Sequence, residues 1–308
     1  MDEDPVISSD IPSVSLVGLG RMGNAIAEAF LQSGHRVVVW NRSIAKAEAL
    51  SALGAIVATS AAECIQLTKL TVVCVVDSCA LKDILMNCDA TVCSGRTIVN
   101  YTSGSPTQIR EVEALIKERG FSSYVQGAIE AMPECIGSTE TVIWHSGDPD
   151  CFESAKPILS ALGKVLYIDS NPLSASMREL VLGTCLFSLA AGFCQAIALL
   201  KSIDGFEYGQ TERFATEVAI PTIEQSTYML HQIAQQTDAQ NYVTQGSGAT
   251  LGLLQVALEN ITRANDEQGI SSVVLEPILE LIRARVVDGG RDDGMGAIID
   301  LFKKPNNK

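Results

Sequence analysis

The amino-acid sequence predicts an α/β fold, with a doubly wound, mostly parallel sheet followed by an all-α domain that begins with a long interdomain helix. Short apolar runs alternate with helix-like stretches from residue 13 to about residue 170, and after Pro172 only helical periodicity remains. The length of 308 residues exceeds one typical domain and suits two. We therefore expect an acidic disordered tail over residues 1–12, a sheet domain over residues 13–172 and a helical domain over residues 173–308.

Strands of the first domain are expected where apolar and β-branched residues run together between turn-forming residues. The expected ranges are Val14–Val17, Arg36–Trp40, Leu70–Val76, Thr97–Tyr101, Ser123–Val125, Glu140–Trp144 and Val165–Ile168. Helical periodicity occupies the intervals, for example over Ala45–Leu53, Ser105–Glu118 and Cys151–Leu162. Alternation of this kind is typical of a parallel sheet with helices on both faces.

Helices of the second domain are expected over Ser174–Ser202, Gln210–Gln236, Thr250–Glu267, Ser272–Asp288 and Met295–Phe302. The first of them contains 21 successive uncharged residues, a length that would span a bilayer. A helix that is apolar all round can equally be buried inside a large protein. We interpret it as a helix between the domains that its own chain and a partner subunit cover, in preference to a membrane span.

A glycine-rich turn follows the first expected strand and leads directly into a helical pattern. Its residues are Gly18, Leu19, Gly20, Arg21, Met22 and Gly23. In a strand–turn–helix context, glycines at this spacing allow a tight turn, close approach of a pyrophosphate and close packing of helix on strand. Free N–H groups at the helix N-terminus favour the phosphates. The turn therefore predicts a Rossmann domain that binds a dinucleotide.

The residues after the second expected strand indicate which dinucleotide is bound. An NAD-selective site places Asp or Glu at this point, whereas this chain has Asn41, Arg42 and Ser43, with Lys46 shortly after. The planar guanidinium of Arg42 suits a 2′-phosphate. An alternative is a polar turn in which Ser43 caps the next helix, and both interpretations can hold together. We expect NADP(H).

Composition excludes several classes of partner. The net charge of −14 argues against a nucleic acid and is compatible with a cationic small substrate, although a solvated acidic surface is the commoner explanation. The nine cysteines form no C-x-x-C pair and the three histidines are far apart, so we expect neither a metal site nor disulfides. The N-terminus lacks the pattern of a signal peptide, and we expect a cytoplasmic protein without membrane association.

With these motifs placed, the chain resembles the imine reductases and reductive aminases, a branch of the β-hydroxyacid dehydrogenase superfamily related to 6-phosphogluconate dehydrogenase. The resemblance rests on residues 18–23, 39–43, 98–106, 127–137, 192–193, 241–247 and 259–261. It implies NADPH-dependent reduction of a C=N bond. It also implies an intertwined homodimer, in which the long helix and helical domain of one subunit complete the cleft beside the other subunit's cofactor.

The resemblance also implies further site residues. Besides the glycine turn and residues 41–46, the cofactor is expected to contact Val75, Val76, Thr102, Ser103 and Ala131. The substrate pocket is expected to contain Met132, Leu182, Phe187, Thr222 and Leu254. Several of these depart from the family's usual residues, as Phe187 does by lacking the hydroxyl of a tyrosine. The pocket is therefore remodelled, and the substrate's identity does not follow from the resemblance.

Glu179 is the first candidate for a catalytic residue. It stands where the family has an acid or a tyrosine near the substrate nitrogen, and where hydroxyacid dehydrogenases place a catalytic lysine followed four residues later by an asparagine, here Gly183. A carboxylate attracts an iminium cation, and in its neutral form it can donate the proton. The alternative is structural, because Ser176 to Glu179 fits an S-x-x-E capping box at a helix start.

Two further residues complete the expected catalytic group. Glu130 stands where the family has an apolar residue and would add a second carboxylate near the nicotinamide, unless it is a loop carboxylate facing solvent. Ser103 would contact the nicotinamide carboxamide or the substrate, or else only close the turn before Pro106. Tyr101, Trp144 and Tyr167 are expected in the core; they are not counted as site residues.

The sequence thus predicts an NADPH-dependent reductase of a cyclic imine, or of an iminium formed from an amine and a carbonyl, in alkaloid-type secondary metabolism. One alternative is a reductase of a small aldehyde or 2-oxo acid. The glutamate at position 179 counts against it, because that class of enzyme has a lysine there. The other is a catalytically silent NADP-binding dimer, which the loss of a tyrosine at Phe187 keeps open.

Overall fold

The computed structural model describes residues 13–244 and 248–304, so the expected tail over residues 1–12 lies outside it. The chain divides into two compact units, one up to Thr184 and one from Cys185. Helix α8 (Leu173–Lys201) contributes its first turns to the first unit and the rest to the second. The first turns are hydrogen-bonded to the sheet unit through the Ala175 N–H and the Ser176 hydroxyl.

The first unit is built on one eight-stranded sheet in the order β3-β2-β1-β4-β5-β6-β7-β8. Its strands are β1 (Ser13–Val17), β2 (Arg36–Trp40), β3 (Ile56–Val57), β4 (Leu70–Val73), β5 (Thr97–Asn100), β6 (Ser123–Glu130), β7 (Val142–Gly147) and β8 (Lys164–Tyr167). All neighbouring strands are parallel except β6 and β7. The strand order reverses between β1 and β4, and such a reversal leaves a crevice at the carboxyl ends of the strands. The prediction of a doubly wound, mostly parallel sheet is confirmed.

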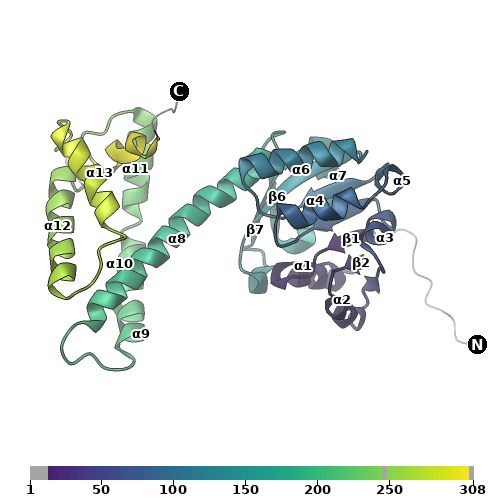
Figure 1. Ribbon diagram of the computed structural model, residues 1–308, viewed down its shortest axis with the longest axis horizontal. Coiled ribbons are helices and arrows are strands. Elements are labelled where there is room, and N and C mark those ends of the chain that lie inside the picture. The colour runs from purple at the N-terminus through teal and green to yellow at the C-terminus, as the bar shows by residue number, and fades with distance from the viewer. Residues whose placement is uncertain (1–12, 245–247, 305–308) are drawn as a thin grey trace, which may run out of the picture. The chain divides into compact units, whose positions relative to one another are not determined.

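Helices cover both faces of this sheet (Figure 1), because successive residues of a buried strand point to opposite sides. Leu16 of β1 packs in the core with α1 (Arg21–Gln32), α2 (Ile44–Ser51) and α7 (Pro149–Leu159). The next residue, Val17, packs in the opposite core. The helices of that face are α3 (Ala61–Gln66), α4 (Ser78–Met86), α5 (Ala90–Cys93) and α6 (Pro106–Glu118).

The second unit is helical, as expected. After α8 it contains α9 (Gln210–Phe214), a π-helical turn (Ala215–Ala219), α10 (Ile220–Gln225), α11 (Tyr228–Ala239), α12 (Leu251–Glu267), α13 (Glu276–Val287) and a 3₁₀ helix (Met295–Phe302). A small core forms around Leu251 and Ile282. The Arg285 guanidinium, 2.7 Å from the Asp293 carboxylate, ties the end of α13 to the loop that follows it.

The structure corrects several expected boundaries. The single helix expected over 210–236 is divided into α9, α10 and α11. Pro221, which offers no N–H donor, and the π-helical turn before it lie at the break between α9 and α10, and a turn at Ser226 and Thr227 separates α10 from α11. Residues 295–302 form a 3₁₀ helix instead of an α-helix. Strand β6 extends five residues beyond the expected end at Val125, to Glu130, because β7 pairs with it along that length.

Candidate cofactor and catalytic site

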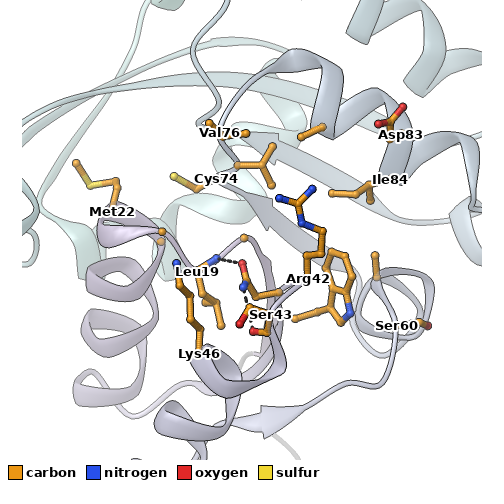
Figure 2. A pocket seen from close by; sticks show the side chains of 18 of the residues that line it. Leu19, Met22, Arg42, Ser43, Lys46, Ser60, Cys74, Val76, Asp83 and Ile84 are labelled. Carbon is orange, nitrogen blue, oxygen red and sulfur yellow. Dashed lines mark hydrogen bonds between the residues drawn. The ribbon is translucent and has the colours of Figure 1, made fainter.

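A cavity of about 830 Å³ opens at the reversal point of the sheet (Figure 2). Its walls come from the glycine turn, the end of β2, the segment after β4, the first turn of α3 and one face of α4 as far as the residue that follows it. The lining residues are Gly18–Gly23, Trp40–Ser43, Lys46, Ser60–Ala62, Cys74–Val76, Ala80, Asp83, Ile84 and Asn87. The cavity therefore contains ten of the expected cofactor residues together in the glycine turn and after β2, and also Val75 and Val76.

Each glycine of the turn has a separate structural reason. Gly18 has a φ of +100°, a backbone conformation that residues other than glycine rarely adopt. A Cβ on Gly23 would lie 2.1 Å from the carbonyl oxygen of Gly18, so the helix could not approach the turn. A Cβ on Gly20 would meet nothing within 4 Å, which leaves open space before the N-terminus of α1. The turn thus provides the close approach and the free N–H groups that a pyrophosphate needs.

The end of β2 is joined to the glycine turn by Asn41. Its Oδ1 accepts a hydrogen bond from the Leu19 N–H at 3.0 Å, and its Nδ2 donates to the Ser43 carbonyl at 3.0 Å. Ser43 precedes α2 but its side chain makes no capping hydrogen bond. Figure 2 shows Arg42 with its guanidinium directed toward Val76 and Ile84, and Lys46 extending beside Leu19. The cationic side chains of Arg42 and Lys46 therefore line this part of the cavity, together with the Ser43 hydroxyl, which makes no capping hydrogen bond.

Thr102 is bonded to a residue of the cavity wall but does not itself line the cavity. Its side chain is 1% exposed, and its Oγ1 accepts a hydrogen bond from the Val75 N–H at 3.1 Å. Asn100 Oδ1 accepts from the Thr102 N–H, and Asn100 Nδ2 donates to Gln126 Oε1 at 2.9 Å. Buried polar groups satisfied in this way fix the backbone that carries them. Ser103 and Ala131 are also absent from the lining residues of this cavity.

The start of α8 is fixed on the sheet by three contacts. The Ala175 N–H donates to Ser146 Oγ at 3.0 Å, and Ser176 Oγ donates to the Gly104 carbonyl at 2.9 Å. The guanidinium carbon of Arg178 lies 4.8 Å from the centre of the Trp144 ring. These contacts orient the helix so that Ser103 Oγ donates a hydrogen bond to Glu179 Oε1.

The capping-box alternative for Glu179 does not hold. Helix α8 begins at Leu173, so Ser176 lies inside it and its hydroxyl is bonded to Gly104. The Leu173 N–H instead donates to Asn171 Oδ1 at 3.2 Å. The carboxyl group of Glu179 is directed to Ser103 on a different segment, where it accepts that residue's hydroxyl hydrogen bond.

The charge of Glu179 contributes to the raised pKa values of Glu130 and Cys74. Burial raises the pKa of Glu130, and repulsion by the Glu179 carboxylate raises it further. Burial also raises the pKa of the Cys74 thiol, to about 11, with Glu179 as the second cause. Cys74 lines the cofactor cavity, so the two carboxyl groups lie within electrostatic reach of each other beside that cavity.

Comparison with known proteins identifies the family. Residues 13–170 match the NAD binding domain of 6-phosphogluconate dehydrogenase, and residues 173–304 match the C-terminal domain described as NADPH-dependent reductive aminase-like. The NADPH-dependent reductive aminase of Aspergillus oryzae is 35% identical over 295 residues, which cover 96% of this chain and 98% of that protein. The chain belongs to the reductive aminase family.

Solved structures of this reductive aminase family have the same fold. A reductive aminase from Aspergillus terreus, in complex with NADPH and ethyl levulinate, is 34% identical with a TM-score of 0.87 over 95% of this chain and 100% of that chain. An imine reductase from Myxococcus stipitatus, in complex with NADP⁺, is 28% identical with a TM-score of 0.87 over 95% of this chain and 100% of that chain. The resemblance stated from the sequence is confirmed.

The residues expected to form the substrate pocket of this reductive aminase-like chain are divided between the two units. Met132 and Leu182 belong to the first, and Phe187, Thr222 and Leu254 to the second. None of the five lines the cavity described above. Tyr101, expected in the core, is buried and its hydroxyl lies 2.7 Å from His145 Nε2.

Sequence reasoning missed the part of the cavity wall that α3 and α4 supply. Asp83, Ile84 and Asn87 of the α4 region line the cavity, as do residues 60–62 at the start of α3. No local motif marks them. The available signal was topological: β3 and β4 run parallel with β1 in this sheet, so the segments that follow them must leave the sheet at the same edge as the glycine turn.

Proposed function

We propose that this protein is an NADPH-dependent imine reductase, which reduces the C=N bond of a cyclic imine or of an iminium formed from an amine and a carbonyl compound. The observation that carries the proposal is the carboxyl group of Glu179, held by the Ser103 hydroxyl near the cavity that fits a dinucleotide. A carboxylate in such a place stabilises positive charge on nitrogen.

The residues of the cavity suit NADPH. The glycine turn and the N-terminus of α1 would hold the pyrophosphate, and Arg42, Ser43 and Lys46 would hold the 2′-phosphate, with no carboxylate directly after β2 to favour NADH. When bound, the reduced nicotinamide supplies a hydride. The Thr102–Val75 hydrogen bond would keep the cavity wall beside it in place.

Side-by-side turnover measurements test the reaction class. We expect the protein to oxidise NADPH with 1-pyrroline, and to do so far more slowly with glyoxylate, because a carboxylate at position 179 attracts a cation and repels an anionic 2-oxo acid. Faster turnover of glyoxylate would support the carbonyl reductase instead. Tight NADPH binding without turnover of either compound would support the silent dimer.

We also propose that the active protein is a homodimer in the cytoplasm, working in alkaloid-type secondary metabolism. The apolar stretch of α8 is long enough to cross a bilayer, yet none of it is buried within the single chain. Leu182, Leu186 and Phe187 are exposed there, with 79% of Phe187 accessible. A second copy that covers this stretch would remove that apolar surface from water. All nine cysteines are free, which supports a reducing compartment.

A further inference from the structure

We propose that two carboxyl groups divide the acid–base chemistry of this site: Glu179 holds the positively charged substrate nitrogen, and Glu130 delivers the proton to it. The inference rests on the proposed imine reduction. It assigns separate roles to two carboxyl groups that the sequence analysis only places together near the nicotinamide.

Sheet geometry places both groups at one edge. Strands β5 and β6 are parallel, with Asn100 opposite Gln126, so the chain that leaves β5 and the end of β6 emerge at the same carboxyl edge. Ser103 lies three residues after Asn100, and Glu130 lies four residues after Gln126. Pairing of Glu130 with Val142 in the antiparallel β6–β7 ladder fixes its backbone. Glu179 reaches the same edge through its bond with Ser103.

The surroundings of the two carboxyl groups differ. Glu179 Oε1 accepts the hydrogen bond that the Ser103 hydroxyl donates, so this carboxyl oxygen serves as an acceptor at the site. Glu130 is half-buried at the end of its strand, and both burial and the neighbouring carboxylate favour its neutral form by raising its pKa. The acceptor position of Glu179 suits a group that holds a cation, and the raised pKa of Glu130 suits a proton donor.

Other groups around the pair leave this assignment intact. Cys74, after β4, has a thiol pKa of about 11, so it stays uncharged at neutral pH. Arg178, which precedes Glu179 on α8, rests on the Trp144 ring. Glu134, in the turn after β6, forms an ion pair with the Arg21 guanidinium at 2.6 Å, and both side chains are exposed to solvent.

The proton transfer balances without any further reactant. The lone pair of a neutral imine nitrogen takes the proton of the Glu130 carboxyl group, so the O–H bond breaks, an N–H bond forms, and an iminium and a carboxylate result. Glu179 holds the iminium cation. The carbon of the iminium group then accepts the hydride with its two electrons, which yields the neutral amine. Glu130 regains a proton from water.

Two substrates separate the roles. 1-Pyrroline requires a proton before or during reduction, whereas N-methyl-1-pyrrolinium carries a permanent charge and requires none. We expect Glu130→Gln to lower kcat for 1-pyrroline by about 10²-fold, the usual contribution of a general acid. For N-methyl-1-pyrrolinium, the same substitution should lower kcat by only about tenfold. Glu179→Gln should impair both substrates, because both present a cation. Glu140→Gln, at an exposed position before β7, is the control.

Infrared spectroscopy gives a readout that does not depend on turnover. In the NADP⁺-bound protein, the carboxylic-acid C=O band of Glu130 should persist above the ordinary glutamate pKa of about 4.3 and disappear in Glu130→Gln. In Glu179→Gln its titration midpoint should fall, because the repelling charge is gone. Equal losses on the two substrates in Glu130→Gln, or a band unchanged by that substitution, would overturn the division of roles. Failure of the wild-type protein to reduce either substrate would instead refute imine reduction itself.

Discussion

Arg42 and Lys46 lie just beyond the end of β2, where Rossmann domains contact the adenosine ribose. Both side chains line the cavity. Asn41, which directly precedes Arg42, accepts a hydrogen bond from the Leu19 N–H and so joins this segment to the glycine turn. A guanidinium binds a phosphate with two parallel hydrogen bonds, which gives Arg42 more discrimination than a point charge would have.

Replacement of Arg42 by Ala should therefore weaken NADPH binding and leave NADH binding almost unchanged. Loss of a charge-assisted contact worth about 1.5–3 kcal/mol corresponds to a roughly 10- to 100-fold higher Kd for NADPH. Titration of both cofactors by calorimetry measures the difference. Arg36→Ala, at the opposite end of β2, is the matched control. If NADPH and NADH binding fell equally, Arg42 would have no part in recognising the 2′-phosphate.

At the scale of elements, the strand–turn–helix unit of β1 and α1 combines two different constraints. Gly23 is required by packing, because a Cβ there would collide with the Gly18 carbonyl at 2.1 Å. Gly20 has open space around it and an ordinary φ of −68°, so the fold itself tolerates a methyl group. The space at Gly20 is needed only by a ligand.

Alanine substitutions separate these constraints. Gly23→Ala should lower both the melting temperature and NADPH affinity, with a loss of about 1–3 kcal/mol in the free energy of unfolding from overpacking. Gly20→Ala should keep the wild-type melting temperature and still bind NADPH poorly, since its methyl group occupies the approach of the pyrophosphate. Thermal denaturation with and without NADPH measures both effects. Normal NADPH binding by Gly20→Ala would place the pyrophosphate elsewhere.

The same unit explains what could be predicted from the sequence. The glycine turn and residues 41–46 are encoded locally, and the structure brings them together in one cavity. Thr102, which the family resemblance expects to contact the cofactor, is buried, and its hydroxyl accepts a hydrogen bond from the Val75 N–H, 27 residues distant, a contact that no local pattern reveals. Ser176 and Glu179 match a capping box by spacing alone, whereas the actual helix start at Leu173 depends on Asn171 and on contacts with the sheet. Local patterns predicted local geometry, and long-range contacts decided the rest.

For the whole molecule, the exposed apolar stretch of α8 is the feature that the single chain leaves unexplained. Large apolar surfaces are costly in water and are normally covered by a partner. The second unit also contains Phe187, Thr222 and Leu254, which the family resemblance assigns to the substrate pocket. In an intertwined dimer, one partner would cover this stretch and supply these residues.

If the proposed dimer forms through this stretch, Leu186→Glu should convert it into monomers and abolish imine reduction, because a charge buried in an apolar interface has no compensating partner. Light scattering coupled to size-exclusion chromatography measures the mass, and NADPH binding should survive because the cofactor cavity lies entirely within the first unit. Val287→Glu, at an 89% exposed residue that ends α13, is the control for an added charge on an exposed apolar position. A wild-type protein that migrates as a monomer and is active would refute the shared cleft. A Leu186→Glu protein that stays dimeric would show that the interface lies away from this stretch of α8.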